Sequence, residues 1–426
     1  MSQTDQNDPT NRSWLPVYCD PRSFLPTVQE TIILFAEPPY LFQDFVGKAI
    51  TFLRSEMVRK MGFAFDPRTA LPCKWKCSDE AVFGVDLCLY AYTGHYPFDK
   101  GKVGGCFNQA SMRSAVHNCR TNIDFGGSHV GYAPGPAGGT FGAITRPLHG
   151  EKSSTDCSHL MATIAPFKQV YDDARRNILL FSPEPDRVLI SIPNEFVRPS
   201  WSSHRIKLLV DLERLTRGNV PCDVKKAYTH RRAGRSLFDV HPEFMEAVPP
   251  AEAARFRTLE RQPIERELTA DYFNIFDSET ELCDGVPTQR LLPYMKYILS
   301  SKLAPYPLKA AVTNSNIEYN NLADSVRAEE FRPHAFASFT GVFIDMFDAA
   351  LDCYVNLFQP IGISIKPSGR SREVEIPPAE VHQIFDQLVP AAPVLPLRGV
   401  LGYDRPQQVL EKFTFGPGHF ASGWGR

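Results

Sequence analysis

The stretch LPCKWKCSDE, residues 71–80, places a cysteine where a short predicted strand ends and a predicted helix begins. Apolar and polar residues alternate from 71 to 77, which is typical of a strand. Residues 80–92 have the composition of a helix, and Gly94 is a plausible stop signal for it. In parallel α/β sheets, functional side chains gather beyond the carboxyl ends of the strands. Cys77 is therefore predicted to lie at a functional edge of the sheet.

The same alternation of strands and helices continues along the chain. Helices are predicted over 41–61, 160–180 and 203–215, and strands over 122–125, 130–132, 140–145 and 187–192. This order predicts an α/β fold whose mostly parallel sheet is flanked by helices.

The expected domain organisation has three parts. Residues 1–38 form an irregular N-terminal arm, 39–220 an α/β domain, and 221–426 a mainly helical C-terminal domain or extension. Longer helices are expected in the extension over 288–302, 333–358 and 378–388. The extension is expected to provide contacts or assembly and no metal ligand.

Composition narrows the class of protein. The chain has 426 residues, 43% of them hydrophobic and 22% charged, and a net charge of −2. This balance gives no electrostatic reason to expect nucleic acid or an anionic membrane as a partner. The N-terminus lacks the pattern of a signal peptide, and no apolar run approaches the roughly 20 residues that span a bilayer. We therefore expect a cytoplasmic protein whose ten cysteines are thiols or metal ligands.

Cys77, His129 and Cys157 are the candidate metal ligands. His129 lies among glycines in GGSHVGY, where the backbone can approach another group closely, and Cys157 precedes a predicted helix. Two thiolates and an imidazole bind Zn²⁺ well, and three protein ligands leave a fourth position for water. A thiol hydrolase that uses Cys157 and His129 is a less favoured alternative.

A second metal arrangement is also open. Cys73 and Cys77 are spaced as C-x3-C, and they could form a structural four-cysteine site with Cys106 and Cys119. A single pair with this spacing is a weak signal, so the Cys-His-Cys set is preferred.

Several short motifs occur in the order found in one known family. The predicted helix 45–62 ends at the dipeptide GF, residues 62–63, and CSDE follows at 77–80. Further along are VGG at 103–105, GGSHVGY at 126–132 and a segment that runs from Arg146 to Cys157. These motifs resemble the theta-class carbonic anhydrases, also called the limiting-CO2-inducible protein B family. The resemblance covers about residues 40–220.

The resemblance implies a zinc-centred α/β fold similar to that of the beta-class carbonic anhydrases, in a homodimer or higher homo-oligomer. It implies that Cys77, His129 and Cys157 bind zinc and that Asp79 is the acidic partner beside the metal. The expected activity is that of a zinc-dependent lyase, the reversible hydration of CO2 to bicarbonate by zinc-bound hydroxide.

The chain departs from the family at one point. The family pairs the acidic residue with an arginine in the following helix, and no Arg or Lys occurs here between Asp79 and Lys100. A cation from another loop, Arg113, Arg120 or Arg146, would have to replace it, and Arg113 is assigned this catalytic role. Without such a cation, the chain would be a catalytically silent zinc-binding module acting in assembly or in regulation related to CO2 and bicarbonate. A hydrolase of a CO2 analogue such as COS or CS2 is a further alternative.

Overall fold

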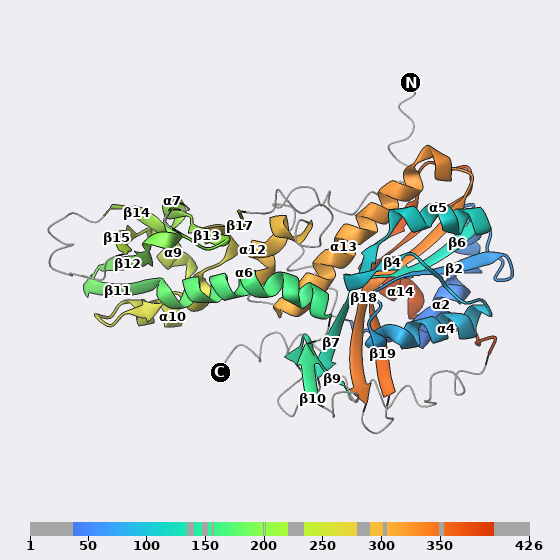
Figure 1. Ribbon diagram of the computed structural model, residues 1–426, viewed down its shortest axis with the longest axis horizontal. Coiled ribbons are helices and arrows are strands. Elements are labelled where there is room, and N and C mark those ends of the chain that lie inside the picture. The colour runs from blue at the N-terminus through green and yellow to red at the C-terminus, as the bar shows by residue number, and fades with distance from the viewer. Residues whose placement is uncertain are drawn as a thin grey trace. The chain divides into compact units, whose positions relative to one another are not determined.

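The structure is a computed structural model of the chain. It describes residues 37–133, 140–146, 152–155, 157–198, 200, 202–219, 234–278, 290–300, 305–348 and 353–395. The expected N-terminal arm lies almost wholly outside the described residues. The chain divides into two compact units (Figure 1). Unit 1 comprises Met1–Met161 with Leu303–Arg426, and unit 2 comprises Ala162–Lys302.

A nine-stranded mixed sheet forms the centre of unit 1, and its inner strands are parallel. The strand order is β1 (Tyr40–Leu41), β19 (Cys353–Lys366), β18 (Ala335–Asp348), β6 (Thr121–Gly126), β2 (Ala70–Trp75) and β3 (Phe98–Asp99). Strands β18, β6, β2 and β3 run parallel, whereas β19 pairs antiparallel with β18. Strand β7 (His129–Ala133) continues the parallel pairing along the second half of β18. The predicted α/β fold with a mostly parallel sheet and flanking helices is confirmed.

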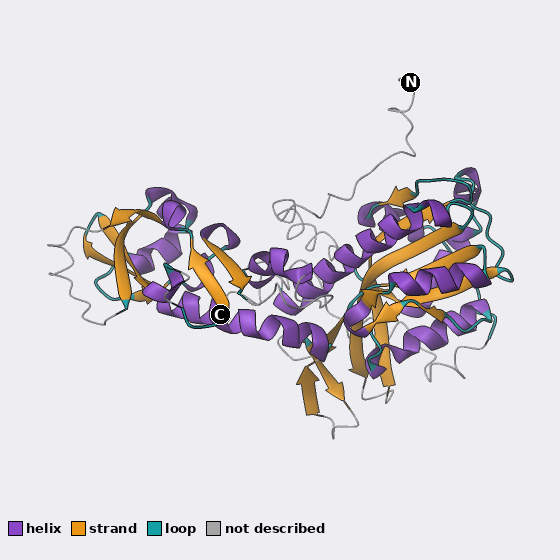
Figure 2. Ribbon diagram, turned by 45° about the horizontal axis from the view of Figure 1, so that its top comes forward, coloured by secondary structure: helices purple, strands orange, loops and turns teal. Residues whose placement is uncertain are grey.

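Helices cover both faces of this sheet (Figure 2). On one face, α2 (Phe42–Leu53), α4 (Phe83–Thr93) and α14 (Pro378–Phe385) pack in a large core with side chains such as Phe339. On the other, α5 (Gln109–Asn118) and α13 (Tyr306–Arg327) pack around a second core. Because successive strand residues point to opposite faces, Phe336 of β18 belongs to that second core.

The predicted helix over 333–358 is wrong. This segment forms β18 and the start of β19, a long antiparallel hairpin. Nearly every residue of β18 is buried, because strands lie on both sides of it and helices cover both of its faces. Such a strand has a near-continuous apolar sequence, which periodicity alone does not distinguish from a buried helix.

Unit 2 is built from antiparallel strands and short helices. Its five-stranded sheet has the order β14 (Thr216–Asn219), β15 (Arg235–Val240), β12 (Arg187–Pro193), β11 (Leu179–Glu184) and β16 (Gln262–Pro263). A separate pair joins β13 (Ile206–Val210) to β17 (Phe273–Asp277). The predicted helix over 203–215 is therefore wrong. The buried residues of β13 recur at every second position, the period of a strand, and only α7 (Leu212–Leu215) is helical.

The division of the chain differs from the expected boundary near residue 220. In the sequence, unit 2 lies between the two segments that make up unit 1. The second of these segments supplies α13, β18 and β19 to unit 1. That part is consequently not mainly helical, since two of the longest strands of the central sheet come from it. Within the described residues, no helix is both long and apolar enough to cross a bilayer.

Candidate metal centre

The three predicted ligand residues meet in unit 1. A ligand atom from each of Cys77, His129 and Cys157 lies within 4.8 Å of the other two. All three side chains are buried, with exposed fractions of 5%, 1% and 2%. Among the described residues, this is the one group of three or more His, Cys or acidic side chains whose ligand atoms converge in this way.

The sheet topology explains why Cys77 and His129 are neighbours. Cys77 follows β2, and His129 begins β7 just after β6 has ended at Gly126. Strands β2 and β6 are adjacent and parallel, with Trp75 opposite Gly126 in the register. Both residues therefore lie just beyond the carboxyl ends of two adjacent parallel strands, the usual position of functional groups in parallel sheets.

Cys157 reaches the cluster from a different segment. It immediately precedes α6 (Ser158–Asn177), and its carbonyl accepts a hydrogen bond from the Met161 amide. Its φ angle is +41°, in the left-handed region that non-glycine residues rarely adopt. Such a conformation costs on the order of 1–3 kcal/mol and is concentrated at functional sites.

Hydrogen bonds shift the pKa values of the Cys77 and Cys157 thiols in opposite directions. A hydrogen bond from the Cys157 thiol, reinforced by His129 and the Gly104 amide, lowers the pKa of Cys77 to about 3 despite the burial that raises it. The same bond to Cys77, together with burial, raises the pKa of Cys157 well above its usual range. The cluster thus holds one thiolate readily, and a cation between the two sulfurs would favour the second.

A buried carboxylate fixes the orientation of His129. Asp345 Oδ2 lies 2.8 Å from His129 Nδ1, and both side chains have no exposed surface. The other oxygen, Oδ1, accepts a hydrogen bond of 2.7 Å from Asn356 Nδ2. With Nδ1 engaged by the carboxylate, Nε2 is the nitrogen that would bind a metal. A carboxylate behind a ligating imidazole is the usual arrangement in zinc sites.

Asp345 was not identified as a site residue from the sequence. It lies on β18, beside β7, and is 216 positions away from His129 in the chain. A signal was nevertheless present, because a charged residue inside a long apolar stretch costs free energy unless it has a partner. Asn356 extends this support, since it also donates to the Ala81 carbonyl at 2.7 Å.

Arg146 supplies the cation that the sequence lacks near Asp79. It lies on β9 (Ala143–Arg146) and donates from Nη1 and Nη2 to the two oxygens of Asp79 at 3.1 and 3.0 Å. Arg146 also pairs with Glu80, and its Nε donates to Ser154 at 2.9 Å. Burial raises the pKa of Asp79, but hydrogen bonds from Arg146 and the Ala81 amide outweigh it, so that the pKa is lowered. The carboxylate is therefore ionised and held in one orientation.

The structure does not bring Arg113 to this site, in contrast to the role assigned to it from the sequence. Arg113 lies on α5 with a side chain that is 75% exposed, and it pairs with Glu330 at 3.2 Å. Arg120 is likewise exposed. Of the three cations considered from the sequence, only Arg146 contacts Asp79. Its position depends on a contact across 67 residues, which local sequence cannot reveal.

The alternative four-cysteine set is not assembled. Cys73 is buried beside Asn122, with its Sγ 3.4 Å from Oδ1, and Cys119 donates to the backbone carbonyls of Thr69 and Thr121. Neither belongs to the cluster of converging ligand atoms.

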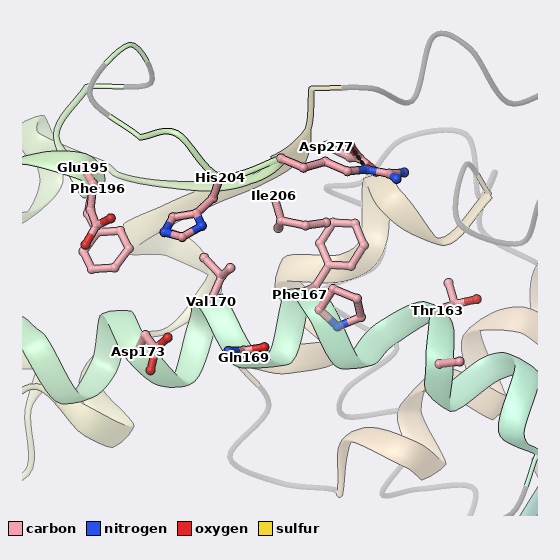
Figure 3. Close-up of a pocket in the computed structure, with 13 residues that line it drawn as sticks. Thr163, Phe167, Gln169, Val170, Asp173, Glu195, Phe196, His204, Ile206 and Asp277 are labelled. Atoms are coloured by element: carbon pink, nitrogen blue, oxygen red, sulfur yellow. Dashed lines mark hydrogen bonds and ion pairs between the residues drawn. The ribbon is translucent and has the colours of Figure 1, made fainter.

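A separate groove of about 480 Å³ lies in unit 2 (Figure 3). Phe167 and Val170 of α6 form part of its wall, and Glu195 and His204 face it from the other side. It shares no residue with the metal cluster, and its polar side chains do not converge as a ligand set.

The residues of the cluster fit a zinc ion. Two sulfurs and one imidazole nitrogen are a known zinc donor set, and the carboxylate behind His129 selects the ring nitrogen. The Gly104 amide donates to Cys77 Sγ at 3.2 Å, as expected for a site built to hold a thiolate.

Comparison with known proteins gives a likeness in fold. No family model and no curated protein sequence matches this chain. The structure is similar to that of PtLCIB4, a homologue of the limiting CO2-inducible protein LCIB, at 12% identity and a TM-score of 0.42, covering 82% of this chain and 98% of that chain. A point mutant of PtLCIB4 aligns at 13% identity and a TM-score of 0.43. LCIB itself aligns at 12% identity and a TM-score of 0.35, with 82% and 98% of the two chains covered. All three TM-scores are below 0.5, so we draw no conclusion about this chain from these likenesses.

Proposed function

We propose that this protein is a zinc-dependent, carbonic anhydrase-like lyase of the limiting-CO2-inducible protein B type that interconverts CO2 and bicarbonate. The observation that carries the proposal is the juxtaposition of a buried Cys77-His129-Cys157 cluster with an Asp79–Arg146 ion pair. A binding module without catalysis would need the cluster but not the oriented carboxylate.

The chain's own residues would divide the work as follows. Cys77, His129 and Cys157 would hold the metal, and Asp345 would keep the imidazole in place. Bound zinc would supply the Lewis acidity that activates water for addition to CO2. Asp79 would orient that water by accepting a hydrogen bond from it, because its carboxylate is ionised and lies two residues after a ligand.

Arg146 would keep Asp79 from serving as a metal ligand. Both carboxylate oxygens already accept hydrogen bonds from the guanidinium, and one also accepts from the Ala81 amide at 3.0 Å. A bidentate Arg–carboxylate pair has a fixed geometry. The carboxylate would therefore stay in place as an acceptor. This ion pair is why we favour an active lyase over a silent zinc module.

Metal analysis combined with stopped-flow CO2 hydration tests the proposal. We expect about one zinc per chain and a rate of hydration that disappears when zinc is removed and returns when it is restored. Cys77→Ser and His129→Ala should each lose the metal. Zinc content unchanged in both variants would refute the assignment of the ligands.

Asp79→Asn separates the enzyme from the silent module. In an enzyme, this change should lower turnover by about 10²- to 10⁴-fold while zinc stays bound. Asn is also a good helix cap, so the hydrogen bond to the Ala81 amide that Asp79 accepts can be kept. Full activity in Asp79→Asn would reduce the residue to a cap. A zinc-replete wild-type protein without activity toward CO2 would instead favour the silent module, or COS or CS2 as substrate.

Assembly and location belong to the same proposal. By its resemblance to the family, the protein would act as a homodimer or higher homo-oligomer. The interpretation of its ten cysteines as thiols and metal ligands is why we propose a cytoplasmic location. Light scattering of the zinc-loaded protein checks the first statement, because a monomer at micromolar concentration would contradict it.

A further inference from the structure

Helix α13 buries a polar face, which requires an explanation. Asn314 and Ser315 are 1% and 0% exposed, and other polar residues of the same helix are equally buried. Burying an amide or a hydroxyl costs free energy unless it forms hydrogen bonds. Their partners therefore show what this part of the helix does.

The Asn314 amide joins two loops beside the metal cluster. Its Nδ2 donates to the Gly104 carbonyl at 3.2 Å and to Ser128 Oγ at 2.7 Å. Ser128 Oγ in turn donates to the same Gly104 carbonyl at 3.4 Å. Asn314 thus ties the loop at Gly104 to the residue that immediately precedes His129.

Gly104 needs such a restraint because of its conformation and its contact. Its φ angle is +80°, in the left-handed region, and its amide donates to Cys77 Sγ at 3.2 Å. The carbonyl and the N–H of Gly104 belong to successive peptide units joined at its Cα, so a bond to the carbonyl restrains the orientation of the residue as a whole. The bond from Asn314 to the carbonyl consequently helps to aim the N–H at the sulfur.

Ser315 makes the corresponding contact on the histidine side. Its Oγ accepts a hydrogen bond of 2.8 Å from the Ser128 amide. The backbone amide of Ser128 is thereby held against α13, directly before His129 enters β7. Two consecutive helix residues therefore restrain the surroundings of two of the three ligand residues.

We propose that Asn314, with Ser315, is a positioning residue of the metal centre, which sets the Gly104 hydrogen bond to Cys77 and the approach of His129. The inference rests on the proposed metal site and deepens it. Asn314 touches neither metal nor substrate, and it acts through Gly104 and Ser128. Substitution of a residue that supports a metal ligand in this way typically lowers metal affinity by about 10- to 100-fold.

Asn314→Leu tests the proposal on the full-length protein, because leucine has a similar volume and no donor. We expect zinc affinity, measured by competition with a chelator, to fall about 10- to 100-fold. In the cobalt-loaded protein, the thiolate-to-metal charge-transfer band should move to longer wavelength, because a weaker N–H···S bond raises the energy of the sulfur electrons. Loss of stability alone would not move this band in the protein that remains folded.

Two further variants keep the test decisive. Ser315→Ala removes only the contact to Ser128, so zinc affinity should fall by less and the charge-transfer band should stay in place. Thr313→Val is the matched control, because Thr313 is 0% exposed on the same helix and its hydroxyl donates to the Lys309 carbonyl at 2.6 Å, a bond that stays within the helix. If Asn314→Leu does not fold, a wild-type affinity in Ser315→Ala would by itself overturn the proposal.

The outcomes distinguish this inference from the proposed function. Wild-type protein that binds no zinc or cobalt would refute the metal site itself. Wild-type protein that binds metal, together with an Asn314→Leu variant of unchanged affinity and spectrum, would refute only the positioning role.

Discussion

The two units of this protein differ in how completely they bury ion pairs: unit 1 encloses both partners of some pairs, whereas unit 2 leaves the arginine partly exposed even where the carboxylate is buried, as in Arg255–Glu267. In unit 1, the pairs Lys100–Asp124 and His129–Asp345 have no exposed surface. In unit 2, the Arg187–Asp239 pair is exposed by 25% and 28% on its two sides. Burial without a partner would be costly, so a buried pair marks a position that the fold has to specify. The comparison supports our proposal that the chemistry belongs to unit 1, where the metal cluster lies.

The largest effect on the metal centre is expected when the part of the chain that follows Val220 is removed. A protein that ends at Val220 lacks α13, β18 and β19, and with β20 (Val374–Ile376) it loses three of the nine strands of the central sheet, together with the second part of unit 2. We expect it to show no cooperative unfolding and to bind no stoichiometric zinc. Near-ultraviolet circular dichroism and zinc analysis measure both. A soluble, folded fragment with one zinc per chain would show that the cluster needs only the first part of the chain.

Arg146 and Arg113 provide a matched test within unit 1. Arg146→Gln should lower the rate of CO2 hydration by about 10²-fold or more, because Asp79 loses the cation that orients it. Arg113→Gln should leave the rate unchanged, since that side chain is exposed and pairs with Glu330. Stopped-flow kinetics at saturating zinc compare the two variants. An equal change in the hydration rate of both variants would contradict the role of Arg146 in orienting Asp79.

Asp345 tests whether a buried charge in unit 1 serves the metal centre or only the fold. Asp345→Asn should weaken zinc binding by about 10- to 100-fold, because the imidazole loses its charged partner. Asp124→Asn is the control: it is equally buried but pairs with Lys100, so it should lower thermal stability and leave zinc affinity intact. Chelator competition and thermal unfolding give the two readouts. Unchanged zinc affinity in Asp345→Asn would contradict its supporting role.

Glu267 gives the smallest effect and concerns unit 2. Burial, together with a hydrogen bond that its protonated carboxyl donates to Glu252, raises its pKa from 4.5 to about 7. Because the folded-state pKa is higher than the unfolded one, the stabilisation is complete below about pH 4.5 and is lost as the pH rises through 7. Glu267→Gln should remove this pH dependence, which amounts to about 1–3 kcal/mol. Urea unfolding between pH 5 and 8 measures it, and an unaltered slope in the variant would point to another group.

The sequence revealed those features of the site that depend on local context. Cys77 could be located because a strand, a cysteine and a helix follow one another within residues 71–92. His129 and Cys157 also stood in distinctive surroundings. The supporting residues could not be found in this way, because Asp345 reaches His129 only through the parallel register of β7 and β18. The same holds for Arg146, whose partner Asp79 is distant in the chain.

The fold was predictable where periodicity was unambiguous and failed where it was not. Helix α2 has a clear apolar face, and the expected helix over 41–61 corresponds to it and to α3 (Glu56–Lys60), separated by a cap at Ser55. Strand β18 is apolar on both faces, so its sequence does not show the two-residue alternation that indicates a strand. Helix α13 was missed for the opposite reason, because the polar side chains that it buries make it look like a loop.

The position of unit 2 within the sequence of unit 1 also has a consequence for the synthesis of the protein on the ribosome. All three cysteine and histidine residues of the cluster have been synthesised by residue 157, whereas the strands that enclose them end at Lys366. At roughly 5–20 residues per second, this gap lasts on the order of 10–40 s. During that interval two thiols are present without the sheet that later covers them. The nascent chain therefore depends on a reducing environment, or on early capture of a metal ion, before its own fold can protect the site.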